Sequence, residues 1–261
     1  MAFATLNCFS DVLEVGITLN VVLPQATREQ IGVDSLDSAA PAGDPPLLYL
    51  LHGLSDDHSA WMRYTSIERY AAERGIAVVM PAVGRSFYAD ERLGHPYWTF
   101  VSEELPRLVQ TFFRVSDDPA RTFVAGLSMG GYGTLRLALT HPRRYAAAAS
   151  LSGVADIRTL LARPERAEIV RRVFDSAVAP DEDPVQLLAA ADPATLPPLW
   201  IGCGTEDLLI ESNRTFVEQA RAAGATVTAD FRAGDHAWQL WDDQLPDVLD
   251  FFVASMERDS V

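Results

Sequence analysis

The fold can be predicted from one short stretch, Thr122-Phe123-Val124-Ala125-Gly126-Leu127-Ser128-Met129-Gly130-Gly131. Its first four residues are apolar enough to predict a buried strand, and the residues after Ser128 have apolar positions at helical spacing. Gly126 and Gly130 flank Ser128, because a sharp turn from a strand into a helix leaves room only for small residues on both sides. The stretch therefore predicts a strand, a tight turn at Ser128 and a helix.

Strands alternate with helices on both sides of this turn. Short apolar runs predict strands at Leu47–Leu51, Ile76–Met80, Thr122–Ala125, Tyr145–Leu151, Leu199–Cys203 and Thr226–Phe231. Helical periodicity predicts helices at Thr65–Arg74, Trp98–Phe113 with a break at Pro106, from Ser128 to about Thr140, Ile210–Ala223 and Trp238–Ala254. This alternation is typical of an α/β protein with a mostly parallel central sheet and helices on both faces.

The segments outside this regular alternation indicate the domain organisation. Phe3–Pro24 predicts an antiparallel hairpin at one edge of the sheet, and Gln25–Pro46 predicts an exposed loop. The segment 156–192 is too long for one crossover helix, so we expect a helical, lid-like insertion there. We expect residues 1–261 to form one domain, because large α/β domains often reach this length.

Composition excludes several classes of protein. The chain has 21 basic and 36 acidic residues, a net charge of −15, which disfavours binding to nucleic acid or to an anionic membrane. No apolar run approaches the ~20 residues of a membrane span. With two cysteines and no secretory signal, we expect a cytoplasmic protein. The oligomeric state, a homo-oligomer included, is left open.

Ser128 is the candidate nucleophile, and a serine hydroxyl needs a neighbouring base. In this strand-turn-helix arrangement the base follows the serine in the chain, which leaves His141 and His236. His141 ends the helix that starts at Ser128, so it points away from Ser128. His236 follows the last strand, where open α/β sheets bind their ligands. We therefore expect His236 to be the base.

The acid that orients His236 should lie between Ser128 and His236, after a strand. Asp207 follows Leu199–Cys203 and is the leading candidate; Glu206 and Asp156 remain alternatives. Such a carboxylate holds the imidazole tautomer and stabilises the imidazolium.

An oxyanion produced at Ser128 needs two backbone donors. The N–H of Met129, which follows the serine, is one of them. The other is expected from Leu54 in the loop after Leu47–Leu51, where Gly53 lets the backbone approach a substrate. Trp61 and Trp238 are bulky candidates for narrowing the acyl pocket of the substrate site.

A metal site was weighed as an alternative, because His52, Asp56, Asp57 and His58 lie close together. A zinc-hydrolase pattern read from His52 would need histidines at positions 54 and 57, which are Leu54 and Asp57. No G-x-G-x-x-G follows a strand, so a dinucleotide site is not indicated either. We expect no cofactor and no metal.

Four motifs carry a resemblance to a known family. Tyr49-Leu50-Leu51-His52-Gly53, Trp61, Glu103-Glu104-Leu105-Pro106 and Gly126–Gly133 resemble the esterase D superfamily, above all its tributyrin esterase group of small bacterial carboxylesterases. His236-Ala237-Trp238 also resembles the His-x-Trp ending of that group.

The resemblance implies an α/β-hydrolase fold, a Ser-His-Asp triad and hydrolysis of a small-molecule ester with a short acyl chain. Relatives of the group imply alternatives: an S-formylglutathione hydrolase-type thioesterase, a carbohydrate acetyl or feruloyl esterase, or an acyltransferase. The S-formylglutathione hydrolases usually have a Ser-Gly pair where this chain has His52-Gly53, which disfavours the thioesterase. A non-catalytic binding protein on the same fold is disfavoured by the complete triad.

Overall fold

An eight-stranded sheet forms the centre of the computed structural model, which describes residues 1–25, 43–161, 163–175 and 177–258. Its order is β1-β2-β4-β3-β5-β6-β7-β8. The strands are β1 (Ala2–Ser10), β2 (Val15–Leu23), β3 (Leu47–Leu51), β4 (Ala77–Pro81), β5 (Thr122–Leu127), β6 (Ala147–Leu151), β7 (Leu199–Gly204) and β8 (Val227–Arg232). Strands β3 to β8 pair in parallel, and the hairpin β1–β2 joins β4 antiparallel. The predicted mixed sheet is confirmed.

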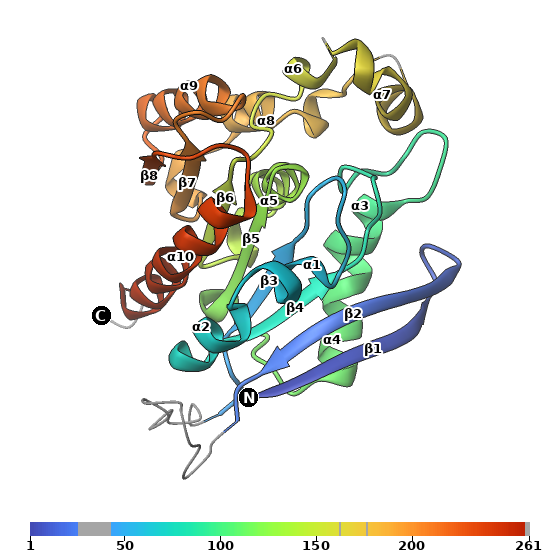
Figure 1. Cartoon of the computed structure of the whole chain (residues 1–261), viewed down its shortest axis with the longest axis vertical. Coiled ribbons are helices and arrows are strands. Elements are labelled where there is room, and N and C mark those ends of the chain that lie inside the picture. Colours follow the sequence, from blue (N-terminus) through green and yellow to red (C-terminus); the bar gives the residue numbers. More distant parts are fainter. Residues whose placement is uncertain (26–42, 162, 176, 259–261) are drawn as a thin grey trace.

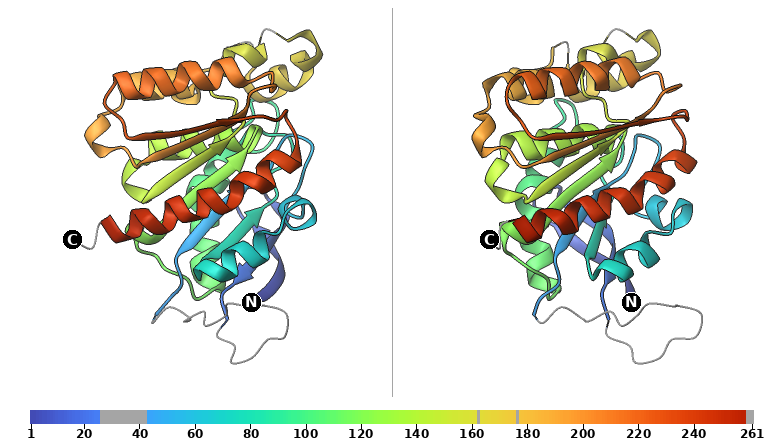
Figure 2. Two further views of the ribbon diagram at one scale, coloured as in Figure 1. Left: turned by 60° about the vertical axis from the view of Figure 1, so that its left-hand side comes forward. Right: turned by 90° about the vertical axis from the view of Figure 1, so that its left-hand side faces the viewer.

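Helices cover both faces of this sheet (Figures 1 and 2). They are α1 (Ala60–Tyr64), α2 (Ile67–Arg74), α3 (Tyr97–Thr99), α4 (Leu105–Phe112), α5 (Met129–Thr140), α6 (Arg158–Leu161), α7 (Ala167–Phe174), α8 (Pro184–Ala190), α9 (Ile210–Ala222) and α10 (Trp238–Arg258). Helices α4, α5 and α9 share one apolar cluster, and α2 and α10 share the other. The predicted α/β-hydrolase architecture is therefore confirmed. The predicted loop Gln25–Pro46 falls largely on residues 26–42, outside the described residues.

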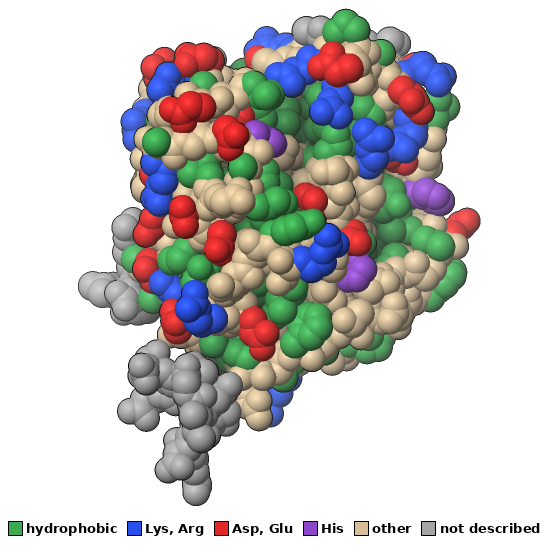
Figure 3. Space-filling model, viewed as in Figure 1, with side chains coloured by type: hydrophobic (Ala, Val, Ile, Leu, Met, Phe, Trp, Pro, Cys, Tyr) green, Lys and Arg blue, Asp and Glu red, His purple; other side chains and the backbone are tan. Residues whose placement is uncertain are grey.

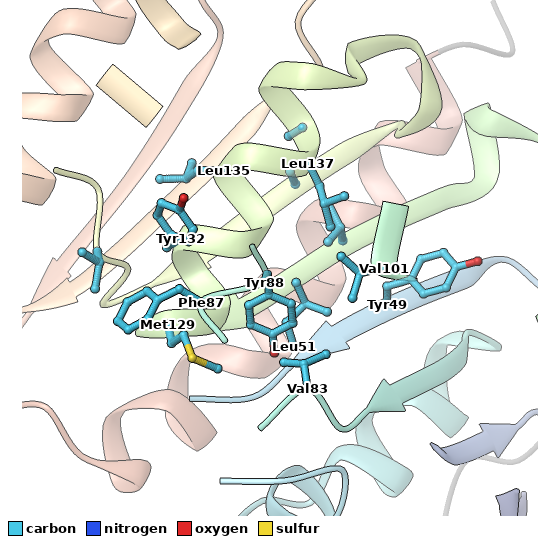
Figure 4. Close-up of a cluster of buried hydrophobic side chains, with 14 of the residues drawn as sticks. Tyr49, Leu51, Val83, Phe87, Tyr88, Val101, Met129, Tyr132, Leu135 and Leu137 are labelled. Atoms are coloured by element: carbon cyan, nitrogen blue, oxygen red, sulfur yellow. The ribbon is translucent and has the colours of Figure 1, made fainter. Parts of the chain in front are cut away.

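The two clusters follow from the alternation of side chains along each strand. In β3, Tyr49 and Leu51 face the cluster of α5, whereas Leu48 and Leu50 face the cluster of α10. Figure 4 shows Tyr49 and Leu51 below α5, which carries Met129, Tyr132, Leu135 and Leu137. All of β3 is buried, as expected for a parallel strand with helices on both sides.

The predicted helix Trp98–Phe113 is interrupted, as Pro106 suggested. Helix α3 passes into a π-helical turn at Phe100–Glu104, and α4 begins directly after it, with Pro106 in its first turn. Proline lacks an N–H and its ring crowds the carbonyl four residues earlier, which disfavours a regular helix there. Glu104, inside the π-helical turn, accepts hydrogen bonds from the Ser10 hydroxyl and the Asp11 N–H.

The segment between β6 and β7 contains α6, α7 and α8. Short 3₁₀ turns connect them at Pro164–Arg166 and Pro180–Glu182, and a third turn, Pro193–Thr195, lies between α8 and β7. Figure 1 shows α6 and α7 at the top of the molecule, beyond the sheet. Helix α8 packs against α5. The Tyr132 hydroxyl of α5 donates a 2.6 Å hydrogen bond to the Glu182 carbonyl, which ties this segment to the helix that begins after Ser128.

Candidate active site

Ser128 lies in a strained turn between β5 and α5. Its backbone has φ 54° and ψ −112°, a conformation that costs a non-glycine residue about 1–3 kcal/mol. The Ser128 N–H donates to the Leu151 carbonyl at 2.9 Å, and the Ser128 carbonyl accepts from the N–H groups of Tyr132 and Val154 at 3.1 and 3.2 Å. These three hydrogen bonds hold the turn in place.

The glycines of the motif are required by close approaches. A Cβ on Gly126 would lie 2.5 Å from the Gly130 carbonyl oxygen, and a Cβ on Gly130 would collide with the Leu51 carbonyl. Both obstacles are backbone atoms that cannot rotate away. The sequence pattern therefore records the tight packing of the turn against β3.

Ser128, His236 and Asp207 form a hydrogen-bonded chain. The Ser128 Oγ lies 3.0 Å from His236 Nε2, and His236 Nδ1 lies 2.8 Å from Asp207 Oδ2. Asp207 follows β7 and its side chain has no exposed surface, whereas the His236 side chain is 30% exposed. Because a carboxylate only accepts, the proton of neutral His236 sits on Nδ1, and Nε2 is free to take the Ser128 proton.

The charge of Asp207 is maintained by hydrogen bonds. Burial alone would raise the pKa of Asp207, but the hydrogen bond and charge of His236, the Leu209 N–H and the Ser152 hydroxyl lower it below its usual value. Asp207 therefore stays ionised at neutral pH.

The two alternative acids lie elsewhere. Asp156 is held by Arg158, whose Nε and Nη2 each donate a 2.8 Å hydrogen bond. Glu206 is exposed and accepts from the Gly234 N–H at 2.5 Å, which ties down the loop that carries His236. Of the three candidate acids, Asp207 alone contacts His236 among the described residues.

His141 is the C-cap residue of α5, as predicted. Burial, followed by the nearby charge of Arg144, lowers its pKa, and its ring stacks on Trp98 with 5.7 Å between ring centroids.

The predicted oxyanion donors border the nucleophile. Met129 is the first residue of α5, so its N–H belongs to the helix-terminal groups without an intrahelical partner. The Leu54 N–H makes no hydrogen bond to any described residue. Both residues line the same cavity as Ser128. The placement leaves both N–H groups available to a substrate carbonyl.

His52 supports the loop that carries Gly53 and Leu54. Its ring is 1% exposed; Nδ1 lies 2.7 Å from the Gly53 carbonyl, and Nε2 accepts from the Val83 N–H at 3.1 Å. The Tyr88 hydroxyl donates to the His52 carbonyl at 2.9 Å. In the described part of the chain, no three His, Cys, Asp or Glu side chains are placed to share an ion.

We expect His52 to make stability depend on pH. Burial lowers its pKa from 6.5 to about 4, so its contribution to stability is complete above pH 6.5 and is lost as the pH falls towards 4. Between pH 7.5 and pH 5 this amounts to about 2 kcal/mol. Urea unfolding at the two pH values should show a smaller loss, by that amount, in His52→Gln than in the wild type. Equal losses in both proteins would contradict this role.

Two cavities meet at Ser128 and His236. The smaller, of about 160 Å³, is lined mainly by apolar side chains, namely Leu54, Phe87, Met129, Val154, Leu160, Leu208 and Leu209, with Thr159, Arg163 and Arg166 among the rest. The larger, of about 530 Å³, is more polar and is bordered by residues that include Gly53, Asp56, Arg85, Arg166, Trp238 and Trp241. Figure 3 shows a hollow in the upper part of the molecule, with basic side chains beside it.

Of the predicted substrate-binding residues, Gly53 and Trp238 line the larger cavity, but Trp61 lines neither. Trp61 is fully buried: its Nε1 donates to the Leu51 carbonyl at 3.1 Å, and its ring meets Trp238 edge-on at 5.2 Å. The prediction that Trp61 itself narrows the pocket is corrected, because its ring is behind Trp238 and supports it.

Two residues that support the site, Ser152 and Trp241, are not predicted from the sequence. Ser152, directly after β6, accepts a hydrogen bond from Trp241 Nε1 at 3.1 Å and also bonds Asp207. The Trp241 ring meets the His236 ring edge-on at 5.0 Å. The position of Ser152 at the carboxyl end of a strand was a signal that could have identified it.

Comparisons with known proteins agree with this geometry. The acetyl esterase of Caldicellulosiruptor saccharolyticus is 26% identical over 264 residues, which cover 96% of this chain and 98% of that protein. Among solved structures, the fluorophosphonate-binding serine hydrolase FphF of Staphylococcus aureus has a TM-score of 0.86 and 32% identity, covering 97% of this chain and 98% of FphF. The S-formylglutathione hydrolase of the same organism has a TM-score of 0.82 and 33% identity, with the same coverage.

The family profile described as "Putative esterase" matches residues 10–252. The match takes in the turn at Ser128 and extends past His236 into α10. Of the two relatives aligned over nearly their whole length, the one at 32% identity is a serine hydrolase and the one at 33% identity is an S-formylglutathione hydrolase. The chain therefore belongs to this esterase family and is one of its serine hydrolases.

Proposed function

We propose that this protein is a serine carboxylesterase that hydrolyses short-chain acyl esters through an acyl-enzyme intermediate. The observation that carries the proposal is the hydrogen-bonded chain Ser128–His236–Asp207, which opens onto two cavities. The acetyl esterase among the relatives supports the same reaction class.

In the first half of the reaction, Ser128 Oγ attacks the ester carbonyl carbon and its proton passes to His236 Nε2. The carbonyl oxygen becomes an oxyanion held by the N–H groups of Leu54 and Met129. As the ester C–O bond breaks, His236 returns the proton to the leaving oxygen, which departs as an alcohol. Asp207 stabilises the imidazolium without taking its proton.

In the second half, a water molecule replaces the alcohol. His236 Nε2 takes a proton from the water as its oxygen bonds to the acyl carbon, and the same donors hold the new oxyanion. The Ser128 Oγ–C bond then breaks and Oγ regains the proton. The products are a carboxylic acid and the free enzyme.

The smaller cavity fits the acyl group, because its lining is mainly apolar. At about 160 Å³ it is well below the ~300–1,000 Å³ of a typical ligand pocket. Leu160 of α6 contributes to its wall and is 7% exposed. Each methylene that fits gains ~0.8 kcal/mol, and one that does not fit clashes with this wall.

A panel of p-nitrophenyl esters of rising acyl length tests the function. The value of kcat/KM should peak at about two to four acyl carbons, at ~0.8 kcal/mol per methylene that fits, and fall beyond. The Leu160→Ala variant should extend the tolerated length, whereas Leu188→Ala, a buried leucine of α8 outside both cavities, should keep the wild-type profile. Activity should survive EDTA. No hydrolysis of any ester, or loss on chelation, would overturn the proposal.

A thioesterase that acts on S-formylglutathione is the second candidate. The relative of that name, at 33% identity with a TM-score of 0.82, favours it. S-formylglutathione therefore belongs in the same panel. A kcat/KM for it far above that of every oxygen ester would favour the thioesterase.

The wider organisation of the protein is proposed with the function. We propose that residues 1–261 form one domain and that 156–192 is a lid-like insertion. Its Leu160 and Arg166 line the cavities beside Ser128, which supports this assignment. We also propose a cytoplasmic location, supported by the free thiols of Cys8 and Cys203. Within the described ranges, no helix has the length and apolar character of a membrane span.

A further inference from the structure

Three arginines surround the entrance to the candidate active site. Arg85 follows β4, and Arg163 and Arg166 lie between α6 and α7. Arg85 and Arg166 line the larger cavity together with Ser128 and His236. Arg163 and Arg166 also line the smaller cavity. Segments far apart in the sequence thus bring positive charge to one place.

None of these three guanidinium groups forms an ion pair or a hydrogen bond with another described residue. Their neighbours are paired, since Arg158 binds Asp156 and Arg172 binds Glu91. Other arginines of the described residues, Arg143 among them, also lack such partners, so what distinguishes these three is their position at the cavities beside Ser128. A guanidinium left free beside a nucleophile is available to a ligand.

The opposing charge in the larger cavity is small. Asp56 is the one carboxylate among its lining residues, and Asp207 lies behind His236 with no exposed side-chain surface. Burial raises the pKa of Asp56, and the nearby Gly53 backbone partly offsets this by lowering it. Two arginines therefore face one carboxylate, and the lining of the cavity has a surplus of positive charge.

We propose that the substrate's leaving group carries an oxyanion, a carboxylate or a phosphate, bound by Arg85 and Arg166. This inference rests on the proposed esterase function. Guanidinium groups bind both anions through paired N–H donors. This carboxylate or phosphate of the leaving group takes no part in the bond changes, because His236 protonates only the ester oxygen that leaves.

The geometry assigns the anion to the leaving group and not to the acyl group. The larger, more polar cavity, of about 530 Å³, contains both arginines. The smaller, of about 160 Å³, is also bordered by Arg163 and Arg166, but most of its lining, Phe87 and Leu160 included, is apolar. An anion in that small, mainly apolar cavity would lose more of its hydration than one in the larger cavity. At the mouth of the larger cavity it would keep part of its hydration and gain Arg85 and Arg166.

The experiment compares two esters that differ by one charge, 4-acetoxybenzoate and its neutral methyl ester. The ratio of their kcat/KM values, anionic over neutral, should be at least about tenfold for the wild type, since hydrogen bonds to charged groups are the strong ones. Arg85→Gln and Arg166→Gln should each lower this ratio about three- to tenfold. Added NaCl should lower it as well, because the arginines are partly exposed.

Arg143→Gln is the matched control. Arg143 is exposed, lies in a separate groove with His141 and Pro142, and its removal changes the net charge equally. Its ratio should equal that of the wild type. The compound 4-acetoxyphenyl phosphate forms a further arm, which distinguishes a phosphate from a carboxylate as the preferred anion.

The outcomes separate this inference from the proposed function. A ratio near one that no arginine variant changes, with the neutral ester hydrolysed, would overturn the inference and leave the esterase intact. If neither ester nor p-nitrophenyl acetate is hydrolysed, the proposed function itself fails. A preference for p-nitrophenyl hemisuccinate over p-nitrophenyl butyrate that Arg163→Gln abolishes would place the anion on the acyl side and overturn the assignment.

Discussion

Replacement of Ser128 by alanine should lower kcat for ester hydrolysis by at least about 10⁴-fold, because no other group can form the acyl-enzyme. His236→Ala should cost about as much, since Ser128 Oγ, 3.0 Å from His236 Nε2, would lose its base. The double variant should be hardly worse than either single variant, because the two side chains act as one unit. Steady-state kinetics with p-nitrophenyl acetate measures all three.

A fluorophosphonate probe gives a second measurement on the same variants. It should label the wild type once, at Ser128, and leave Ser128→Ala unlabelled. Ser212→Ala is a suitable control, because Ser212 lies in α9 and its hydroxyl bonds only the Leu209 carbonyl. Retained hydrolysis in Ser128→Ala, or additive losses in the double variant, would contradict the serine mechanism.

Replacement of Asp207 by asparagine should lower kcat by about 10³- to 10⁴-fold with little change in KM. The carboxylate accepts the Nδ1 proton of His236 at 2.8 Å. An amide NH₂ in that place would donate to Nδ1 and move the imidazole proton to Nε2. His236 could then no longer accept the proton of Ser128, although the shape of the site would be preserved.

Two matched variants test this assignment. Asp156→Asn removes a carboxylate bound to Arg158, and Glu206→Gln removes an exposed one that bonds the Gly234 N–H. Each should retain most of the activity, and Glu206→Gln should show the larger loss of the two because it loosens the loop of His236. If Asp207→Asn stays active and Asp156→Asn does not, the acid has been assigned wrongly.

The amino-acid sequence is sufficient to predict the architecture and the identity of the candidate nucleophile and base. Five-residue apolar runs such as Leu47–Leu51 indicate buried parallel strands, because they are too short for a helix and a strand with helices on both sides is apolar on both faces. The glycines around Ser128 are needed because neighbouring backbone atoms lie where a Cβ would be, and this requirement belongs to the turn itself. Chain order then selects His236 over His141. These features are local, or depend only on the order of elements, so they can be read without coordinates.

The three-dimensional packing is needed to tell which acid contacts His236 and which side chains line the cavities. Glu206 and Asp207 are adjacent and chemically alike, and the direction of the chain after β7 alone turns Asp207 inward to His236 and leaves Glu206 exposed. The sequence suggests that both Trp61 and Trp238 narrow the pocket, but the structure places Trp61 against the Trp238 ring and in the lining of neither cavity. That Arg85 and Arg166 lie at the same cavity could not be predicted from the sequence. Their proximity depends on how the segment after β6 packs over the end of the sheet. Such packing depends on the summed contacts of the whole chain.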